Sequence, residues 1–305
     1  MAEVLRVRIN KKTDETVGKI SLSSNDDSVG EVVEFESLKK YATGSTVLIL
    51  DGKEQFRGLV VEMSDRTNPP FSYRIVDYSW NLDSEEFVQF TKIRADEALK
   101  KLFVKYNIKY SICSIPTKIS KIYYDKALKD IIKDILSIAG KEQGKKYYYE
   151  VVCGKVIVEE RKKLVVDAKF IVQDDTEVKR SVTDLRNSVV IVDSTDKKGK
   201  ILASVKNKEY ITKFGLKQIV ETLDGTDKKQ QKAKAKSKAE NLLKQNCKQK
   251  NTCSVALFVI SGFWNIRKGR KIKLKSGRLN GWYTIRSVQK TIENGHYWAT
   301  VELEW

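Results

Sequence analysis

The feature that most constrains the fold is a short phrase that the chain uses twice, once near each end. Residues 44–52 read GSTVLILDG and residues 269–277 read GRKIKLKSG, with glycines and apolar residues at the same spacing. A glycine turn, an alternating strand, a second glycine and an apolar return strand predict a β-hairpin. We therefore expect two related β modules, although a match this short also arises in unrelated hairpins. The glycines of the pattern are Gly44, Gly52 and Gly58 in the first copy and Gly269, Gly277 and Gly281 in the second.

The rest of the chain changes period between the two hairpins. Strand-like alternation continues to about residue 90, and apolar residues then recur at helical spacing over 95–106 and 128–138, with Gly140 expected to end the second helix. Strands return from residue 181. We predict an α+β, mainly β fold with two tube-protein-like β-barrel modules around a small α+β middle domain. The predicted domains are 1–92, 93–180 and 181–305, the last with a lysine-rich helix at about 227–250.

Composition indicates a folded, soluble chain. Of its 305 residues, 41% are hydrophobic and 32% charged, and only three are proline. No apolar stretch approaches the roughly 20 residues of a membrane helix, and no signal-peptide segment stands at the start. We therefore expect a protein that is made and kept in the cytosol.

The net charge of +18 raises the possibility of a polyanionic partner. Lysine far exceeds arginine and is spread along nearly every segment, which suits solubility better than recognition by bidentate arginine contacts. In the run Lys145–Tyr149, Tyr147 and Tyr149 share one face of a predicted strand and Tyr148 takes the other, so the rings form no continuous stacking platform. A basic nucleic-acid-binding module is kept as the alternative function.

The sequence offers little catalytic or metal-binding chemistry. Its single histidine, His296, follows the turn dipeptide Asn294-Gly295, where a structural role is favoured over catalysis. Four scattered cysteines contain no Cys-x-x-Cys pair, which argues against a zinc site or a disulfide framework. We predict no enzyme activity, no cofactor and no metal. The cysteines are Cys113, Cys153, Cys247 and Cys253.

The order of segments resembles one known family, the tail hub proteins of contractile phage tails, in the XkdQ/YqbQ-like group of PBSX-type prophage elements and contractile bacteriocins. The resemblance covers almost the whole chain, and the order of the phrases carries it because no single phrase is diagnostic. Two features depart from the family pattern, the lysine-rich helix and Phe214, where the family tends to have tyrosine. The matching phrases are 44–61, Val76-Asp77-Tyr78 with the 95–106 helix, 125–149, 184–187, 211–215, 239–243 and 266–269.

The resemblance implies a structural baseplate protein. Such hubs carry two tube-like β domains per subunit, so that three chains present a pseudo-sixfold ring to the tail tube and a threefold end to the spike. The implied partners are two further copies, the tail tube protein, the spike and baseplate wedge proteins, with the tape measure protein as a further candidate. DNA would at most pass through the channel.

The resemblance also gives the repeated hairpins a role, because they would mark equivalent positions in the two tube-like modules. Lys271, Lys273 and Lys275 share one strand face and are candidates to line the channel, although a solvated face explains them more simply. The expected location is the host cytoplasm during assembly and then the tail baseplate of a virion or bacteriocin. A cell-wall-degrading tail enzyme is a third hypothesis, which the missing catalytic constellation disfavours.

Overall fold

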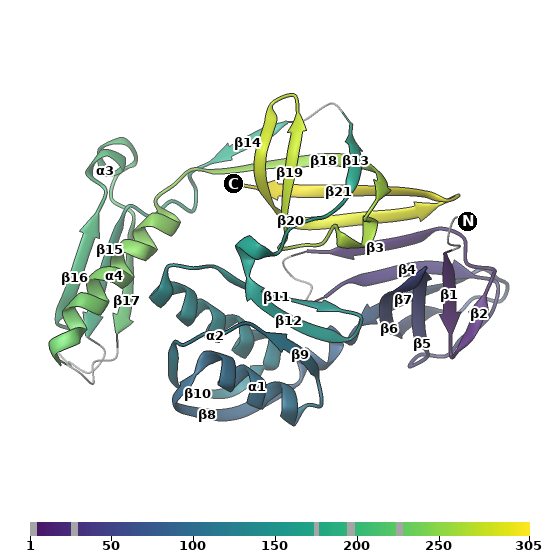
Figure 1. Ribbon diagram of the computed structural model, residues 1–305, viewed down its shortest axis with the longest axis horizontal. Coiled ribbons are helices and arrows are strands. Elements are labelled where there is room, and N and C mark those ends of the chain that lie inside the picture. Colours follow the sequence, from purple (N-terminus) through teal and green to yellow (C-terminus); the bar gives the residue numbers. More distant parts are fainter. Residues whose placement is uncertain (1–4, 26–29, 174–176, 194–198, 224–227) are drawn as a thin grey trace.

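A computed structural model describes residues 5–25, 30–173, 177–193, 199–223 and 228–305 of the chain. Within these residues, the main feature is a 13-stranded antiparallel sheet that joins both ends of the chain and curls into a half-barrel (Figure 1). The prediction of a mainly β chain is confirmed. The order across the sheet is β13-β18-β21-β20-β3-β4-β7-β6-β5-β1-β2, with β14 beside β18 and β19 beside β20.

The N-terminal strands form because apolar and polar residues alternate along them. In β7, Phe71, Tyr73 and Ile75 point into the core, whereas Arg74 between them is exposed. The strands of this region are β1 (Arg6–Ile9), β2 (Lys12–Asp14), β3 (Ile20–Ser24), β4 (Val32–Ser37), β5 (Thr46–Asp51), β6 (Lys53–Ser64) and β7 (Phe71–Asp77).

The C-terminal strands alternate in the same way and share their core with the N-terminal ones. Ala299, Val301 and Leu303 of the last strand are at most 1% exposed and belong to one apolar cluster with Val33 and Ile75. The two ends of the chain are therefore a single packed unit. Its C-terminal strands are β13 (Lys169–Val172), β14 (Val178–Ser181), β18 (Lys250–Ser261), β19 (Lys271–Ser276), β20 (Leu279–Glu293) and β21 (His296–Glu304).

The middle of the chain folds as two helices packed on two small sheets. Leu99, Leu102 and Phe103 of the first helix are buried in a core separate from that of the large sheet. One small sheet pairs β8 with β10 and the other has the order β11-β12-β9. The elements are β8 (Glu85–Arg94), α1 (Ala95–Lys105), β9 (Lys109–Ile112), β10 (Lys118–Ala127), α2 (Leu128–Gln143), β11 (Tyr147–Val152) and β12 (Lys155–Glu160).

The expected end of the second helix at Gly140 is wrong. Helix α2 continues to Gln143, and Gly144, with φ of 66° in the left-handed region, ends it. Gly140 lies inside the helix and is buried, where an added Cβ would come 2.7 Å from the carbonyl oxygen of Lys145. This glycine is therefore required by a close backbone approach rather than by a helix end.

A third unit is inserted between β14 and β18 and lies at the far end of the molecule in Figure 1. Its helix packs Ala235, Ala239 and Leu242 against Val189 and Ile191 of its central strand. The predicted lysine-rich helix corresponds to α4, which ends at Asn246 rather than at about residue 250, and its expected start at residue 227 lies outside the described residues. The elements are β15 (Ser188–Asp193), β16 (Ile201–Lys206), α3 (Lys208–Phe214), β17 (Gln218–Leu223) and α4 (Lys228–Asn246).

The predicted domain division at 92 and 180 stays a prediction. The strand pairings place β8 with the middle unit, because it pairs with β10, and place β13 and β14 with the C-terminal strands, because they pair with β18. No helix among the described residues is long and apolar enough to cross a membrane.

Candidate functional site

Both glycine phrases form β-hairpins, and each hairpin begins with the same pattern of backbone hydrogen bonds. The N–H of Gly44 donates to the carbonyl of Val60 at 2.8 Å, and the N–H of Gly269 donates to that of Ile285 at 2.8 Å. The N–H of Val60 donates to Ser45 and that of Ile285 donates to the residue after Gly269, each at 2.9 Å. Both hairpins therefore begin in the same register.

The equivalence extends to a third strand. In the first copy, a bulge interrupts the pairing of β6 with β7 between Val60 and Glu62. In the second copy, a bulge interrupts the pairing of β20 with β21 between Ile285 and Ser287. A bulge bends a strand and re-aims the residues beyond it. The strands β5-β6-β7 and β19-β20-β21 are therefore two copies of one three-stranded arrangement, which we call the repeated unit.

Four of the six pattern glycines occupy matching positions. Gly44 and Gly269 both have φ of 82°, and Gly52 and Gly277 have φ of 70° and 50°, a region that favours glycine. The other two do not correspond. Gly58 faces Val47 and Gly281 faces Leu274, so the register aligns Gly58 with Tyr283 and Gly281 with Phe56.

The three candidate channel lysines lie on one face of β19. Ile272 and Leu274 between them are at most 1% exposed on the other face, whereas Lys273 and Lys275 are exposed and Lys271 is half-buried. The Nζ of Lys273 lies 5.8 Å from the centroid of the Trp282 ring. That this face borders a channel stays a prediction.

The two ends of the chain meet at an antiparallel pairing of β3 with β20, which we call the joint. It pairs Ile20 with Ile292, Leu22 with Lys290 and Ser24 with Val288. The joint is what makes one continuous sheet out of the two repeated units. Sequence reasoning predicted two β modules and gave no pairing between them.

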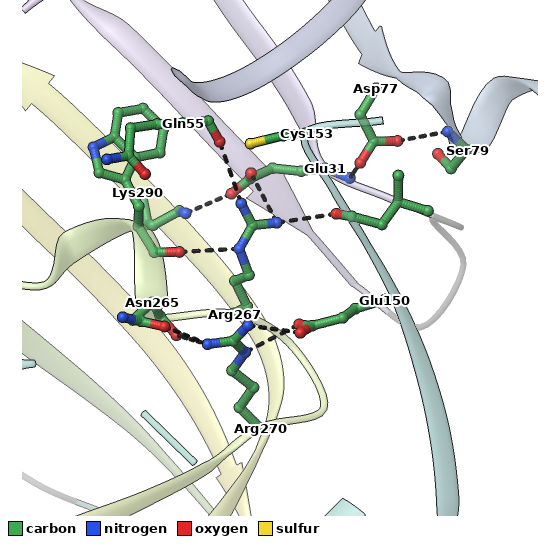
Figure 2. A network of polar contacts seen from close by, with 12 residues as sticks. Glu31, Gln55, Asp77, Ser79, Glu150, Cys153, Asn265, Arg267, Arg270 and Lys290 are labelled. Carbon is green, nitrogen blue, oxygen red and sulfur yellow. Dashed lines mark hydrogen bonds and ion pairs between the residues drawn. The ribbon is translucent and has the colours of Figure 1, made fainter. Parts of the chain in front are cut away.

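A network of buried charged side chains includes Lys290 of the joint, and Figure 2 shows the members of this charge network. Lys290 is fully buried, and its Nζ lies 2.5 Å from a carboxylate oxygen of Glu31, the residue before β4. The same Nζ is 5.1 Å from the ring centroid of Phe263 and 5.5 Å from that of Trp264. The cation is therefore enclosed by one carboxylate and two aromatic faces.

Arginine side chains extend this network to the middle unit. Arg267 lies 3.6 Å from Glu31, and its guanidinium donates to the backbone carbonyls of Trp264 at 2.9 Å and Val151 at 3.2 Å. Arg270 donates two hydrogen bonds, of 2.6 and 3.0 Å, to the carboxylate of Glu150 in β11. This bidentate geometry makes arginine–carboxylate pairs strong. The network therefore joins the N-terminal strands, the C-terminal strands and the middle unit.

Burial and neighbouring charges compete to set the protonation of these groups. Burial by itself raises the pKa of Glu31, but the positive charges of Lys290 and Arg267 outweigh it and hold the pKa below its ordinary value. Burial lowers the pKa of Lys290, with Glu31 opposing that shift. Because each charge has its partner, the group is stable as a set, and removal of one member leaves a buried charge unpaired.

Asp77 supports the network from β7. Its carboxylate accepts the N–H of Glu31 at 3.0 Å and that of Ser79 at 3.0 Å, so it fixes the backbone that presents Glu31. Burial raises the pKa of Asp77 to about 6 against the effect of these hydrogen bonds. Gly30 packs directly on this carboxylate, where an added Cβ would overlap Asp77 and Ser79.

Sequence reasoning missed this network, although one signal for it exists. Val288, Lys290 and Ile292 share one face of the longest C-terminal strand, so a lysine stands where alternation expects a core residue. Its partner Glu31 lies far away in the sequence, and only the fold brings the two together. Among the described residues, no cluster of three or more histidine, cysteine or acidic side chains could hold a metal.

Comparison with known proteins gives one family and a common fold. Residues 7–304 match the profile of a protein family described as YQBQ-like. No curated protein matches the sequence.

Solved tail proteins share this fold over nearly their whole length. The 43 kDa tail protein of prophage MuSo2 from Shewanella oneidensis has a TM-score of 0.68 at 10% identity, covering 98% of this chain and 97% of that one. The tail protein from Neisseria meningitidis MC58 has a TM-score of 0.69 at 11% identity, covering 99% and 96%. Prophage tail protein gp18 from Listeria monocytogenes EGD-e has a TM-score of 0.64 at 13% identity, covering 98% and 94%. At these identities the likeness concerns the fold alone.

Proposed function

The chain belongs to the YQBQ-like family, and on that premise we propose that it is a structural hub protein of a contractile phage-type tail. In this proposal, three copies form a ring that joins the tail tube to the central spike. Neither a cofactor nor a catalytic step is part of the function. The three tail proteins of similar fold support a role of this kind.

The observation that carries the proposal is the repeated unit within one continuous sheet. Its two copies keep the same hairpin register as far as Ile49 and Leu274, and they share the bulge against the third strand. Two equivalent modules per chain let three chains offer six similar positions, which suits an adaptor between a sixfold tube and a threefold spike. Each copy would be the framework of one tube-like β-barrel module.

The proposed partners are the tail tube protein, the spike, baseplate wedge proteins and two further copies of the chain. The buried charge network supports this role because it fixes the orientation of the two repeated units and of the middle unit. Lys271, Lys273 and Lys275 stay candidates for a channel face that meets acidic tape measure segments or passing DNA. The particle would assemble in the host cytoplasm and carry the protein in its baseplate.

Cryo-electron microscopy of purified tail particles tests the proposal. We expect a threefold ring of this protein between tube and spike, and a mass of three chains for the assembled species. A protein that stays monomeric and never enters particles contradicts the hub function. Duplex DNA binding with a steep dependence on salt would instead favour the nucleic-acid-binding alternative.

A further inference from the structure

Among the strand edges of the large sheet that stay unpaired within the described part of the chain, those of β14 and β6 match the two sides of the joint. Strand β14 pairs with β18 on one side, and its other edge meets none of the described strands. Strand β6 pairs with β5 only as far as Leu59, so beyond Val60 it is bonded to β7 alone. Unpaired edges offer N–H and C=O groups to another chain, and proteins normally cover or protect them.

The free end of β6 corresponds to the part of β20 that makes the joint. Val288 pairs with β21 at the second position after its bulge, and Met63 pairs with β7 at the second position after the matching bulge. In β20, the edge from Val288 onward is occupied by β3. The same edge of β6, from Met63 onward, has no described strand bonded to it.

Strand β14 corresponds to β3, the strand that pairs with β20 in the joint. In the first copy, Val60 faces Ile75, which in turn faces Val33 of β4. In the second copy, the matching residue Ile285 faces Leu303, which in turn faces Cys253 of β18. The next strand outward is β3 in the first case and β14 in the second. Leu22 of β3 pairs with Val33, and Val178 of β14 pairs with Cys253.

We propose that β14 of one chain pairs antiparallel with the free end of β6 of a second copy, in the register of the joint. Ser24 faces Val288 in the joint, so Arg180 faces Met63 of the partner subunit. The neighbouring pairs follow, with Lys179 opposite Ser64 of the partner subunit and Ser181 opposite Glu62 of the partner subunit. The inference deepens the proposed hub function and rests on it, because it names the contact that closes the ring.

Burial supports this assignment. Leu22 and Val288 are each 1% exposed in the joint, where a neighbouring strand covers them. Their counterparts Val178 and Met63 also contact the main apolar core but are only half-buried. The proposed pairing would cover both apolar side chains, as the joint covers Leu22 and Val288.

The charges of the two edges are complementary. Lys179 and Arg180 of β14 are exposed, as is Asp65 just beyond β6, which also pairs with Lys40 of its own chain. In the proposed register, Lys179 is diagonal to Glu62 of the partner subunit, and Arg180 is diagonal to Asp65 of the partner subunit, within reach of long side chains. Pairing of β14 with another β14 would instead oppose like charges, which disfavours that competing contact.

Mixed single-cysteine chains test the contact. Lys179→Cys and Ser64→Cys chains are purified separately, mixed and oxidised, and non-reducing electrophoresis detects the products. We expect a disulfide-linked dimer in the mixture and none above the wild-type background in either chain alone, because directly opposed Cβ atoms are close enough for a disulfide. Lys179→Cys mixed with Met63→Cys is the matched control, because residue 63 points to the other face of the strand and should link at least tenfold less.

A charge-reversal series gives an independent readout. Lys179→Glu with Arg180→Glu should move the monomer–trimer midpoint about tenfold to higher protein concentration, and Glu62→Lys with Asp65→Lys in the same chain should restore it. Native mass spectrometry measures the midpoint. Trimers without the cross-link, or without the charge effect, overturn this pairing but leave the proposed ring. A chain that is monomeric at every concentration and absent from tail particles overturns both.

Discussion

The two copies of the repeated unit share the start of their hairpin register and the bulge against the third strand, but they have different surroundings. Strand β5 is covered along its outer edge by β1, whereas its counterpart β19 meets the 164–166 segment only at its first residue. The side chains differ accordingly, since the exposed face of β19 carries lysine where β5 carries Thr46, Leu48 and Leu50. Glycine turns and a bulge therefore preserve the framework, while the neighbours of each copy decide its side chains.

The sharpest contrast lies beyond the bulges. Lys290 stands two residues after Val288, and its counterpart Asp65 stands two residues after Met63. Lys290 is 1% exposed inside the joint, whereas Asp65 pairs with Lys40 at the surface, where both side chains are more than half exposed. Equivalent positions thus carry a buried ion in one copy and a solvated ion in the other.

Removing these two counterpart charges should give the largest difference between the copies. Lys290→Ala leaves Glu31 buried without its closest partner and should lower the free energy of unfolding by about 3–5 kcal/mol. Asp65→Ala breaks an exposed pair and should cost less than about 1 kcal/mol. Urea unfolding measures both. Lys290→Met keeps most of the side-chain volume and separates lost charge from a cavity, and equal costs for Lys290→Ala and Asp65→Ala would contradict the network.

Asp77 should give the stability of the folded chain a pH dependence. Its pKa rises from 3.8 to about 6 on folding, so between these values the folded state binds more protons than the unfolded state. Its contribution to stability is therefore present below pH 3.8 and is lost as the pH rises through 6, by about 3 kcal/mol. Asp77→Asn should remove that loss, measured as unfolding free energy at pH 4 and pH 7.

Asp14 provides the matched control for Asp77. Burial opposes ionisation of Asp14, but hydrogen bonds from Ser37, Thr16 and Tyr41 hold its pKa at about 2. Its stabilising effect is complete above pH 3.8 and falls only as the pH drops toward 2. Asp14→Asn should therefore lower stability yet keep the wild-type slope between pH 4 and 7, and loss of that slope would contradict its assignment to Asp77.

The first glycines of the two hairpins should respond differently to alanine. Gly44 and Gly269 share φ of 82°, which is strained for alanine by about 1 kcal/mol in both. A Cβ at Gly44 meets open space, whereas one at Gly269 would overlap the ring of Tyr148, which adds a further cost of about 2 kcal/mol. In thermal unfolding, Gly269→Ala should have a clearly lower melting temperature than Gly44→Ala. The reverse order would contradict this packing.

The remaining glycines test whether the register or the sequence spacing aligns the copies. A Cβ at Gly58 would overlap the carbonyl oxygen of Val76 and lie 2.9 Å from Ile75, so Gly58→Ala should cost about 1–3 kcal/mol. The nearest atom to a Cβ at Gly281 is 3.7 Å away, an ordinary contact, so Gly281→Ala should change stability by less than about 0.5 kcal/mol. Equal effects in chemical unfolding would mean that the two glycines are equivalent after all.

Local patterns made much of the fold predictable. The alternation of Tyr297–Trp305 and the helical spacing of Ala95–Tyr106 each depend on near neighbours in sequence, and the structure confirms both elements. Gly140 was misjudged because a glycine that permits close packing looks the same in sequence as one that ends a helix. The free edge at Met63 could not be predicted either, because an edge is defined by strands that are distant in sequence.

The sequence by itself determined the two hairpins, the mainly β character and the family, because turn glycines, alternating residues and segment order are local information. Only the tertiary structure decided that β3 meets β20, that Lys290 is buried against Glu31, and which edges are left for another chain. The physical reason is that strand pairing and charge burial join residues hundreds of positions apart. Their energy depends on what the fold brings together, and a local pattern does not identify the distant partner.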